Sequence, residues 1–197
     1  MLAAGAASTV GLRTTGARVS PSQTSDASSI PPGVVTLDDF EALAQQRLST
    51  RDFAIVHSGV ADETTVRWNR EAFQRIRLRP RVLADVSQLD TRLTLLGQSL
   101  AHPILLAPAG VHGQMHPRGE VETARGASRS KTVLVIPSMP SAPVEDIVRA
   151  ADPPPWYQLY VTRDRGATRD EAQRAEHAGC RVLVVTSTAL CPACATR

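Results

Sequence analysis

Short apolar runs alternate with amphipathic stretches over the C-terminal half of the chain. Strands that are covered on both faces read as continuous hydrophobic segments, and four are expected, at 104–107, 132–136, 156–160 and 181–186. Apolar side chains recur at helical spacing between them, over 120–130, 144–150 and 169–178. Gly179 is expected to end the last of these helices. The alternation predicts βαβ units joined in a parallel sheet.

The part of the chain before these units has a helical pattern. Thr36-Leu37-Asp38-Asp39 is typical of a helix start, with Thr36 as the cap and acidic residues in the first turn. A second helix is expected over Asp62–Ile76, and Arg79-Pro80 ends it because the residue before a proline avoids the α region. Leu93–Leu100 predicts a short strand or a hairpin arm.

Two folds are built from such βα units, the open doubly wound sheet and the closed eight-stranded barrel. No strand is followed by a G-x-G-x-x-G or Walker sequence, which weakens the nucleotide-binding doubly wound option. A complete barrel takes about 250 residues, whereas this sequence offers four strands. The barrel interpretation therefore predicts the N-terminal half of a (β/α)8 TIM barrel, with about four βα units preceded by N-terminal helices.

Composition and charge exclude several classes of protein. A chain of 197 residues that is 42% hydrophobic suits one globular domain, and no apolar run approaches the ~18 residues of a membrane span. All but one of the 22 basic residues are arginines, the exception being Lys131. The arginines are scattered among acids, so no nucleic-acid partner is expected. Three cysteines give no disulfide framework, and we expect a cytoplasmic protein.

The side chains at the carboxyl ends of the predicted strands carry hydrogen-bonding groups and few charges. A barrel places its chemistry there, and the residues concerned are Pro108, Ala109, Gly110, Gln158, Tyr160 and Thr186. This set suits a flat cofactor with amide-like edges, because Gln158 offers a donor and an acceptor on one side chain. Tyr160 could orient a substrate oxygen. The alternative is that Gln158 and Thr186 only fill polar layers of the barrel core.

Several ordered fragments of the chain resemble one enzyme family. They are Ser58-Gly59, Asn69–Phe73, Arg79–Val86, Leu96-Gly97, Pro103–Pro108, His116–Glu120, Thr123–Arg125, Gln158–Tyr160 and Arg174–Gly179. In order and spacing they are similar to the FMN-dependent α-hydroxy-acid oxidase/dehydrogenase family, which includes glycolate oxidase, lactate oxidase and mandelate dehydrogenase. The resemblance runs from about Val34 to Thr186.

The resemblance implies a (β/α)8 barrel that carries FMN at its strand ends. Pro108, Ala109 and Gly110 would hold the flavin ring through backbone contacts, and Gln158 and Thr186 would bond its pyrimidine edge. The implied reaction oxidises a small L-2-hydroxy acid to the 2-oxo acid, and full-length relatives are expected to be homo-oligomers.

The resemblance also assigns Tyr160 to the substrate. The family's catalytic histidine and substrate arginines lie beyond the fourth strand, so no catalytic residue and no metal ligand is expected within this chain.

Three positions depart from the family pattern. Ile55 stands where the family has a substrate-contacting tyrosine. Pro137 replaces a flavin-contacting serine, with Ser138 displaced by one residue, and Lys131 replaces a glycine before the second strand.

The sequence after Thr186 departs from the family altogether. One inserted base in a chosen back-translation of 187–196 restores a family-like reading, which suggests a frameshift. We therefore expect a disordered extension over 1–33, a truncated barrel domain over 34–186 and an out-of-frame tail over 187–197. The Cys191-Pro192-Ala193-Cys194 motif in that tail is not expected to bind metal or to have a redox function.

Three functional hypotheses follow. The leading one is an FMN-dependent 2-hydroxy-acid oxidoreductase, in a truncated and inactive form. The alternatives are a non-catalytic half-barrel fragment, whose edge strands could pair with another chain, and another FMN barrel enzyme of the isopentenyl-diphosphate isomerase type.

Overall fold

A computed structural model describes residues 30–187 of the chain. The described residues fall into two units, which divide between Leu43 and Ala44. The expected extension over 1–33 lies almost wholly outside the described residues, as does the expected tail with Cys191 and Cys194.

The first helix begins later than the sequence predicts. α1 spans Asp39–Arg47, and the Asp39 carboxylate accepts hydrogen bonds from the backbone N–H groups of Val35 (2.8 Å) and Thr36 (2.7 Å) and from the Thr36 hydroxyl (3.1 Å). Thr36 was predicted to accept a bond from the helix, whereas its hydroxyl donates one to Asp39. The bonds from Thr36 and Val35 lower the pKa of Asp39 below its usual range.

Two further helices follow, and one of them was missed. α2 spans Thr50–His57 and begins at Ser49, whose hydroxyl oxygen accepts a bond from the backbone N–H of Asp52. This is a capping arrangement that the sequence contained as Ser49-Thr50-Arg51-Asp52. α3 spans Thr64–Arg75 and confirms the helix expected over 62–76.

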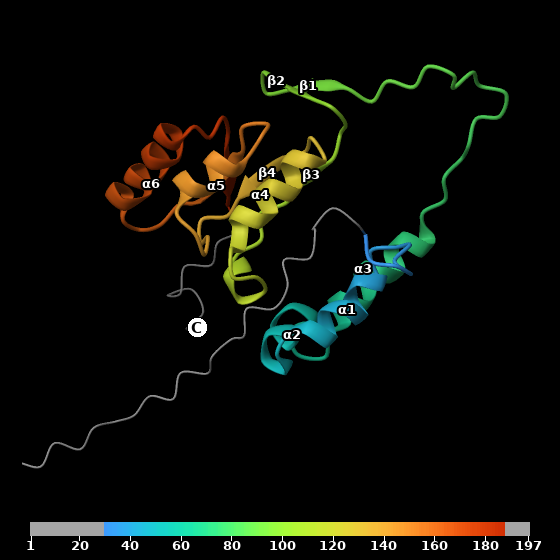
Figure 1. The fold of residues 1–197 in the computed structure, drawn as a ribbon, viewed down its shortest axis with the longest axis horizontal. Coiled ribbons are helices and arrows are strands. Elements are labelled where there is room, and N and C mark those ends of the chain that lie inside the picture. Colours follow the sequence, from blue (N-terminus) through green and yellow to red (C-terminus); the bar gives the residue numbers. More distant parts are fainter. Residues whose placement is uncertain (1–29, 188–197) are drawn as a thin grey trace, which may run out of the picture. The chain divides into compact units, whose positions relative to one another are not determined.

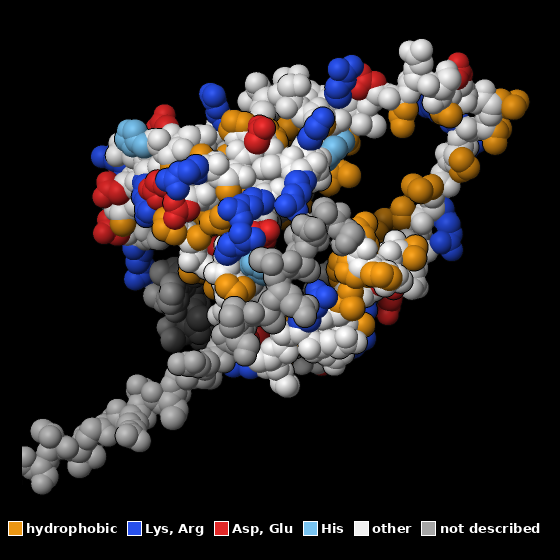
Figure 2. Space-filling view, viewed as in Figure 1, with side chains coloured by type: hydrophobic (Ala, Val, Ile, Leu, Met, Phe, Trp, Pro, Cys, Tyr) orange, Lys and Arg blue, Asp and Glu red, His pale blue; other side chains and the backbone are white. Residues whose placement is uncertain are grey.

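The segment between α3 and the next strand exposes a series of apolar side chains. It is the extended arm that follows α3 in Figure 1, and the orange atoms along it are visible in Figure 2. The most exposed large apolar residues there are Leu78, Val82, Leu83, Val86 and Leu89. So many apolar side chains in one stretch are typical of a surface that another protein element covers.

The expected hairpin arm is a complete antiparallel hairpin. β1 spans Leu93–Leu95 and β2 spans Gln98–Leu100. Gln98 joins this hairpin to the parallel sheet, since its Oε1 accepts a bond from the indole Nε1 of Trp156 at 2.8 Å and its Nε2 donates to the Pro154 carbonyl at 3.0 Å.

The remaining strands form the predicted parallel sheet. β3 (Leu105–Leu106), β4 (Val133–Ile136), β5 (Trp156–Tyr160) and β6 (Leu183–Thr186) are hydrogen-bonded in the order β3-β4-β5-β6. Helices α4 (Gly119–Arg129), α5 (Val144–Ala150) and α6 (Arg165–Ala178) connect successive strands and lie side by side on one face of the sheet (Figure 1). Four βα-type strands with N-terminal helices before them confirm the predicted half of a barrel.

The two faces of the sheet bury different sets of side chains. Leu134, Ile136, Tyr157 and Leu159 pack against the three helices. Leu105, Val133, Val135 and Trp156 point to the opposite face, where they contact Leu100 of the hairpin. Side chains alternate between the two faces along a strand, so Gln158 and Tyr160 share the face of Trp156, away from the helices.

Local differences from the prediction have local causes. α6 begins at Arg165 rather than near 169, because the Asp164 side chain accepts a bond from the Ala167 N–H and caps an earlier turn. Gly179 ends this helix as predicted, at a φ of 110°. Lys131 takes a φ of 52°, the left-handed region that favours the glycine of the resembled family.

No helix among residues 30–187 is long and apolar enough to cross a membrane.

Candidate functional site

Gln158 and Thr186 come together at the carboxyl ends of two neighbouring strands. Tyr160 and Thr186 are register partners in the β5–β6 pair, and the Gln158 Nε2 donates a hydrogen bond to the Thr186 hydroxyl at 3.0 Å. Gln158 is only 3% exposed. The two residues that the resemblance assigned to one cofactor edge are therefore in direct contact, although the role of that contact stays a prediction.

The Gln158 amide is held in one orientation from its other side. Its Oε1 accepts the backbone N–H of Ser138 at 3.1 Å. A primary amide has two N–H donors and a carbonyl with two lone pairs, and these two contacts use one of each. The remaining N–H and lone pair can serve a ligand with a donor and an acceptor side by side.

Ser138 is a structural bridge that the sequence did not reveal. Its hydroxyl donates to the backbone carbonyl of Gln158 at 2.8 Å and accepts the backbone N–H of Tyr160 at 3.1 Å. The adjacent Pro137 has no N–H to donate. The sequence signal was only a serine directly after a strand, and its partners lie about 20 residues further along the chain.

Pro108, Ala109 and Gly110 follow β3 after one residue, Ala107, and are exposed. A side chain at Gly110 would place its Cβ 3.5 Å from the carbonyl oxygen of Met139. The β3–α4 loop therefore runs close to the loop after β4, although no hydrogen bond joins these three residues to Gln158 or Thr186 in the described chain. Small side chains leave their backbone groups open to a ligand.

Tyr160 occupies the last position of β5 and is half-buried. Its backbone N–H is bonded to Ser138, whereas its phenol hydroxyl has no hydrogen-bond partner within residues 30–187. The hydroxyl is thus available to a bound molecule.

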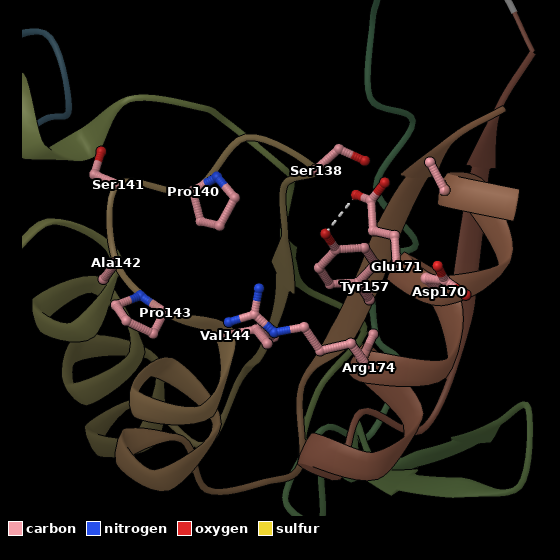
Figure 3. Close-up of a pocket in the computed structure, with 12 residues that line it drawn as sticks. Ser138, Pro140, Ser141, Ala142, Pro143, Val144, Tyr157, Asp170, Glu171 and Arg174 are labelled. Atoms are coloured by element: carbon pink, nitrogen blue, oxygen red, sulfur yellow. Dashed lines mark hydrogen bonds between the residues drawn. The ribbon is translucent and has the colours of Figure 1, made fainter. Parts of the chain in front are cut away.

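A groove lies on the other face of the sheet. It has a volume of about 690 Å³ and runs between the β4–α5 loop and α6 (Figure 3). On its floor the Tyr157 hydroxyl donates to Glu171 Oε1 at 2.7 Å, and burial, followed by this bond to Glu171, raises the pKa of Tyr157 well above its usual range. Tyr157 alternates with Gln158 along β5, so the two side chains point to opposite faces of the sheet, and Ser138 lines the groove as well as contacting Gln158.

An ion pair lies at the rim of the same groove. Arg174 donates to both carboxylate oxygens of Glu145, at 2.8 and 2.9 Å. The bond from Arg174 lowers the pKa of Glu145 to about 2. Both side chains are substantially exposed, so the pair ties α5 to α6 without forming a reactive centre.

Residues 30–187 contain no cluster of side chains able to hold a metal ion. Burial raises the pKa of the Cys180 thiol to about 11, so this cysteine is a poor nucleophile. The His112 ring bonds to the Thr123 hydroxyl at 2.9 Å, and the His102 ring contacts the Ser130 carbonyl oxygen at 3.0 Å. Neither of these rings is hydrogen-bonded to Gln158 or Thr186.

Comparison with known proteins gives this arrangement a context. A family model described as FMN-dependent dehydrogenase matches residues 44–192. A peroxisomal (S)-2-hydroxyacid oxidase of Arabidopsis thaliana is 35% identical over 78% of this chain and 42% of its own length. An L-lactate oxidase of Alicycliphilus denitrificans is 41% identical over 80% of this chain and 43% of its own length.

Solved structures agree with the sequence relatives. A mandelate oxidase crystallised with 3,3-difluoro-2-hydroxy-3-phenylpropionic acid superposes with a TM-score of 0.76 at 32% identity, covering 79% of this chain and 47% of its own. The chain thus spans less than half the length of the relatives it matches.

Proposed function

This chain belongs to the family of FMN-dependent dehydrogenases, and we propose that its strand ends form one part of the flavin site of a 2-hydroxy-acid oxidoreductase. The contact between Gln158 and Thr186 carries the proposal. It holds a buried amide at the carboxyl ends of parallel strands, where barrels bind their ligands.

The residues present fit FMN in part. The spare N–H and lone pair of Gln158 match a ring edge that offers an acceptor beside a donor, and the Thr186 hydroxyl lies within 3.0 Å of that amide. The backbone after Pro108 would support the ring. The chemistry that FMN supplies when bound is the uptake of two electrons from the substrate. Because Pro137 offers no N–H, Ser138 would contribute only by holding Gln158.

The substrate class is a small 2-hydroxy acid. The names of the relatives include glycolate, L-lactate and mandelate oxidases, which share a hydroxyl on the carbon next to a carboxylate. The proposed oxidation would remove the α hydrogen with the C–H electron pair and the hydroxyl proton from the substrate to leave the 2-oxo acid, and FMN when bound would supply the two-electron acceptor. The Tyr160 hydroxyl would orient the substrate. The resemblance assigns the base and the arginines that bind the carboxylate to positions beyond the fourth strand, and we propose that the 197-residue chain alone does not turn over.

FMN titration of the purified chain tests the cofactor site. We expect FMN fluorescence to change on binding, and Gln158→Ala to weaken binding about tenfold, equivalent to about 1.4 kcal/mol. Gln173→Ala, on the exposed side of α6, is the matched control and is expected to bind as the unaltered chain does. Equal FMN affinity of the Gln158→Ala chain and the unaltered chain would show that Gln158 does not contribute to FMN binding.

A second titration tests the substrate. Glycolate, lactate and mandelate are added without oxygen to the flavin-loaded chain, and loss of visible flavin absorbance reports reduction. Persistence of the absorbance with all three acids supports the proposal that the 197-residue chain does not turn over. Rapid bleaching would overturn it.

A non-catalytic assembling fragment is a second candidate, and one observation favours it. Leu183 and Val185 on β6 are 45% and 56% exposed, an unusual state for apolar side chains of a parallel strand. A colourless protein that associates in a concentration-dependent way would favour this function over flavin binding.

Location and assembly stay proposals. We propose a cytoplasmic protein that forms homo-oligomers in its full-length form. The plant relative named above is called peroxisomal, so fractionation of the source cells is the measurement that decides between the two compartments.

A further inference from the structure

Glu120 is a completely buried acidic residue near the start of α4. Its relative exposure is 0%, which is rare for a glutamate unless its carboxyl group is fully bonded. The site described above does not use it. The hydrogen bonds that satisfy its carboxyl group therefore have to be identified.

The Glu120 carboxyl group links two loops that are far apart in sequence. Its Oε1 accepts the backbone N–H of His112 at 3.1 Å, in the β3–α4 loop. Its Oε2 accepts the backbone N–H of Ser141 at 2.8 Å, in the β4–α5 loop. Bonds from backbone N–H groups to a carboxylate are among the stronger hydrogen bonds in proteins.

The Ser141 hydroxyl closes the connection. It accepts the Gly113 N–H at 2.8 Å and donates to Glu120 Oε1 at 3.4 Å. Both loops are thus bonded to Glu120 and also to each other. We call Glu120, His112, Gly113 and Ser141 the loop clasp.

Backbone geometry requires glycine at the clasp. A Cβ on Gly113 would lie 2.7 Å from the Ser141 Cβ, which is closer than two carbon atoms can pack. Gly119 has a φ of 47°, and a Cβ there would lie 3.2 Å from the Gly113 nitrogen. The β3–α4 loop therefore packs directly against the Ser141 side chain of the other loop, with no room for a side chain at Gly113.

The clasp lies on the two loops that the proposed function needs. The β3–α4 loop contains Pro108, Ala109 and Gly110 just before His112, and the β4–α5 loop contains Ser138 just before Ser141. We propose that Glu120 is a positioning residue, which fixes these two loops relative to each other so that the backbone after Pro108 and the Gln158 amide held by Ser138 meet FMN in one geometry. The proposal rests on the proposed flavin function.

A purely structural glutamate would behave differently. Its loss would lower stability and leave the flavin affinity and spectrum of the folded fraction unchanged. Loss of a positioning residue would also change the flavin affinity and spectrum, because loosening the clasp lets the loops move while the sheet stays folded.

The test compares Glu120→Gln with Glu122→Gln. An amide in place of the carboxyl group can accept only one of the two N–H bonds, whereas Glu122 is on the same helix and pairs at the surface with Arg118 and Arg125. We expect Glu120→Gln to weaken FMN binding at least tenfold and to shift the visible flavin spectrum. Glu122→Gln is expected to stay within twofold of the unaltered chain.

Amide hydrogen exchange of the FMN-free chain tests the clasp independently of flavin. Glu120→Gln should speed exchange at His112 and Ser141 more than at the β4 and β5 amides. Unchanged exchange at both sites, or unchanged FMN affinity in a folded variant, would overturn the proposal. Failure of the unaltered chain to bind FMN would overturn the proposed function and the positioning role together, while exchange would still report whether the clasp couples the loops.

Ser141→Ala is the second variant in case Glu120→Gln does not fold. It removes the acceptor of the Gly113 N–H and keeps both backbone bonds to Glu120. We expect about threefold weaker FMN binding and faster exchange at Gly113. No change in either measurement would contradict the clasp.

Discussion

Replacing Thr186 by valine isolates the hydroxyl that meets Gln158. Valine has nearly the same shape, so the change removes one hydrogen-bonding group and leaves the packing of β6 in place. The Gln158 Nε2 then loses its acceptor at 3.0 Å while its side chain stays 3% exposed. A buried donor without a partner costs about 1–3 kcal/mol, so the free energy of unfolding should fall by about that amount.

The same change should also alter ligand binding. Without the Thr186 hydroxyl the Gln158 amide is held only by the Ser138 N–H, and its plane can rotate. We expect FMN affinity to fall between about fivefold and 150-fold, the range that corresponds to about 1–3 kcal/mol. Urea unfolding of the FMN-free chain and fluorescence titration with FMN measure the two effects separately.

Thr94→Val is the matched control. Thr94 is an exposed threonine on β1, and its side chain has no hydrogen-bond partner among residues 30–187. It should change neither quantity by more than about 0.5 kcal/mol. If Thr186→Val and Thr94→Val behave alike in both assays, the contact between Gln158 and Thr186 has no energetic consequence and the site as described is wrong.

Three further predictions concern the fold. Ile147→Ala, at a fully buried position on α5, should cost about 2–5 kcal/mol in urea unfolding, whereas Ile104→Ala at an exposed position should cost far less; similar costs would contradict the two-face core. Lys131→Gly should raise stability by about 1 kcal/mol, because it relieves a positive φ, and a loss of stability would refute this. The pKa of Glu145 is lower in the folded chain, at about 2. Its ionised carboxylate therefore contributes to the free energy of unfolding above the ordinary pKa near 4.5, and this contribution should be lost as pH falls from there toward 2. Arg174→Gln should flatten that part of the pH–stability curve, and an unchanged curve would show that the pair is energetically silent.

The sequence predicted those parts of the fold that local pattern determines. The bounds of α5 and β5 agree with the predicted 144–150 and 156–160, because a continuous apolar run and an amphipathic run each define their own limits. α2 was missed because its apolar residues, Phe53–Val56, are consecutive and do not recur at helical spacing; its capping residues Ser49 and Asp52 were the available signal. The start of α6 was missed because a capping side chain, Asp164, and not hydrophobic spacing, determines it.

The candidate site likewise contains features that the local sequence pattern predicts and features that it does not. Gln158, Tyr160 and Thr186 could be found because each stands at the end of an apolar run, where parallel strands present their functional groups. The bonds that Ser138 and Glu120 make could not be predicted, because they reach residues 20 or 21 positions further along the chain. Contacts of that range depend on how two loops meet in space, and neither periodicity nor composition encodes them.

A crystal structure of the chain with FMN tests the central claim most directly. The account predicts the pyrimidine edge of the flavin within about 2.7–3.2 Å of the Gln158 amide and the Thr186 hydroxyl, on the face of β5 away from the helices. Flavin bound elsewhere, for example in the groove beside Tyr157, with Gln158 and Thr186 bonded only to each other, would contradict it.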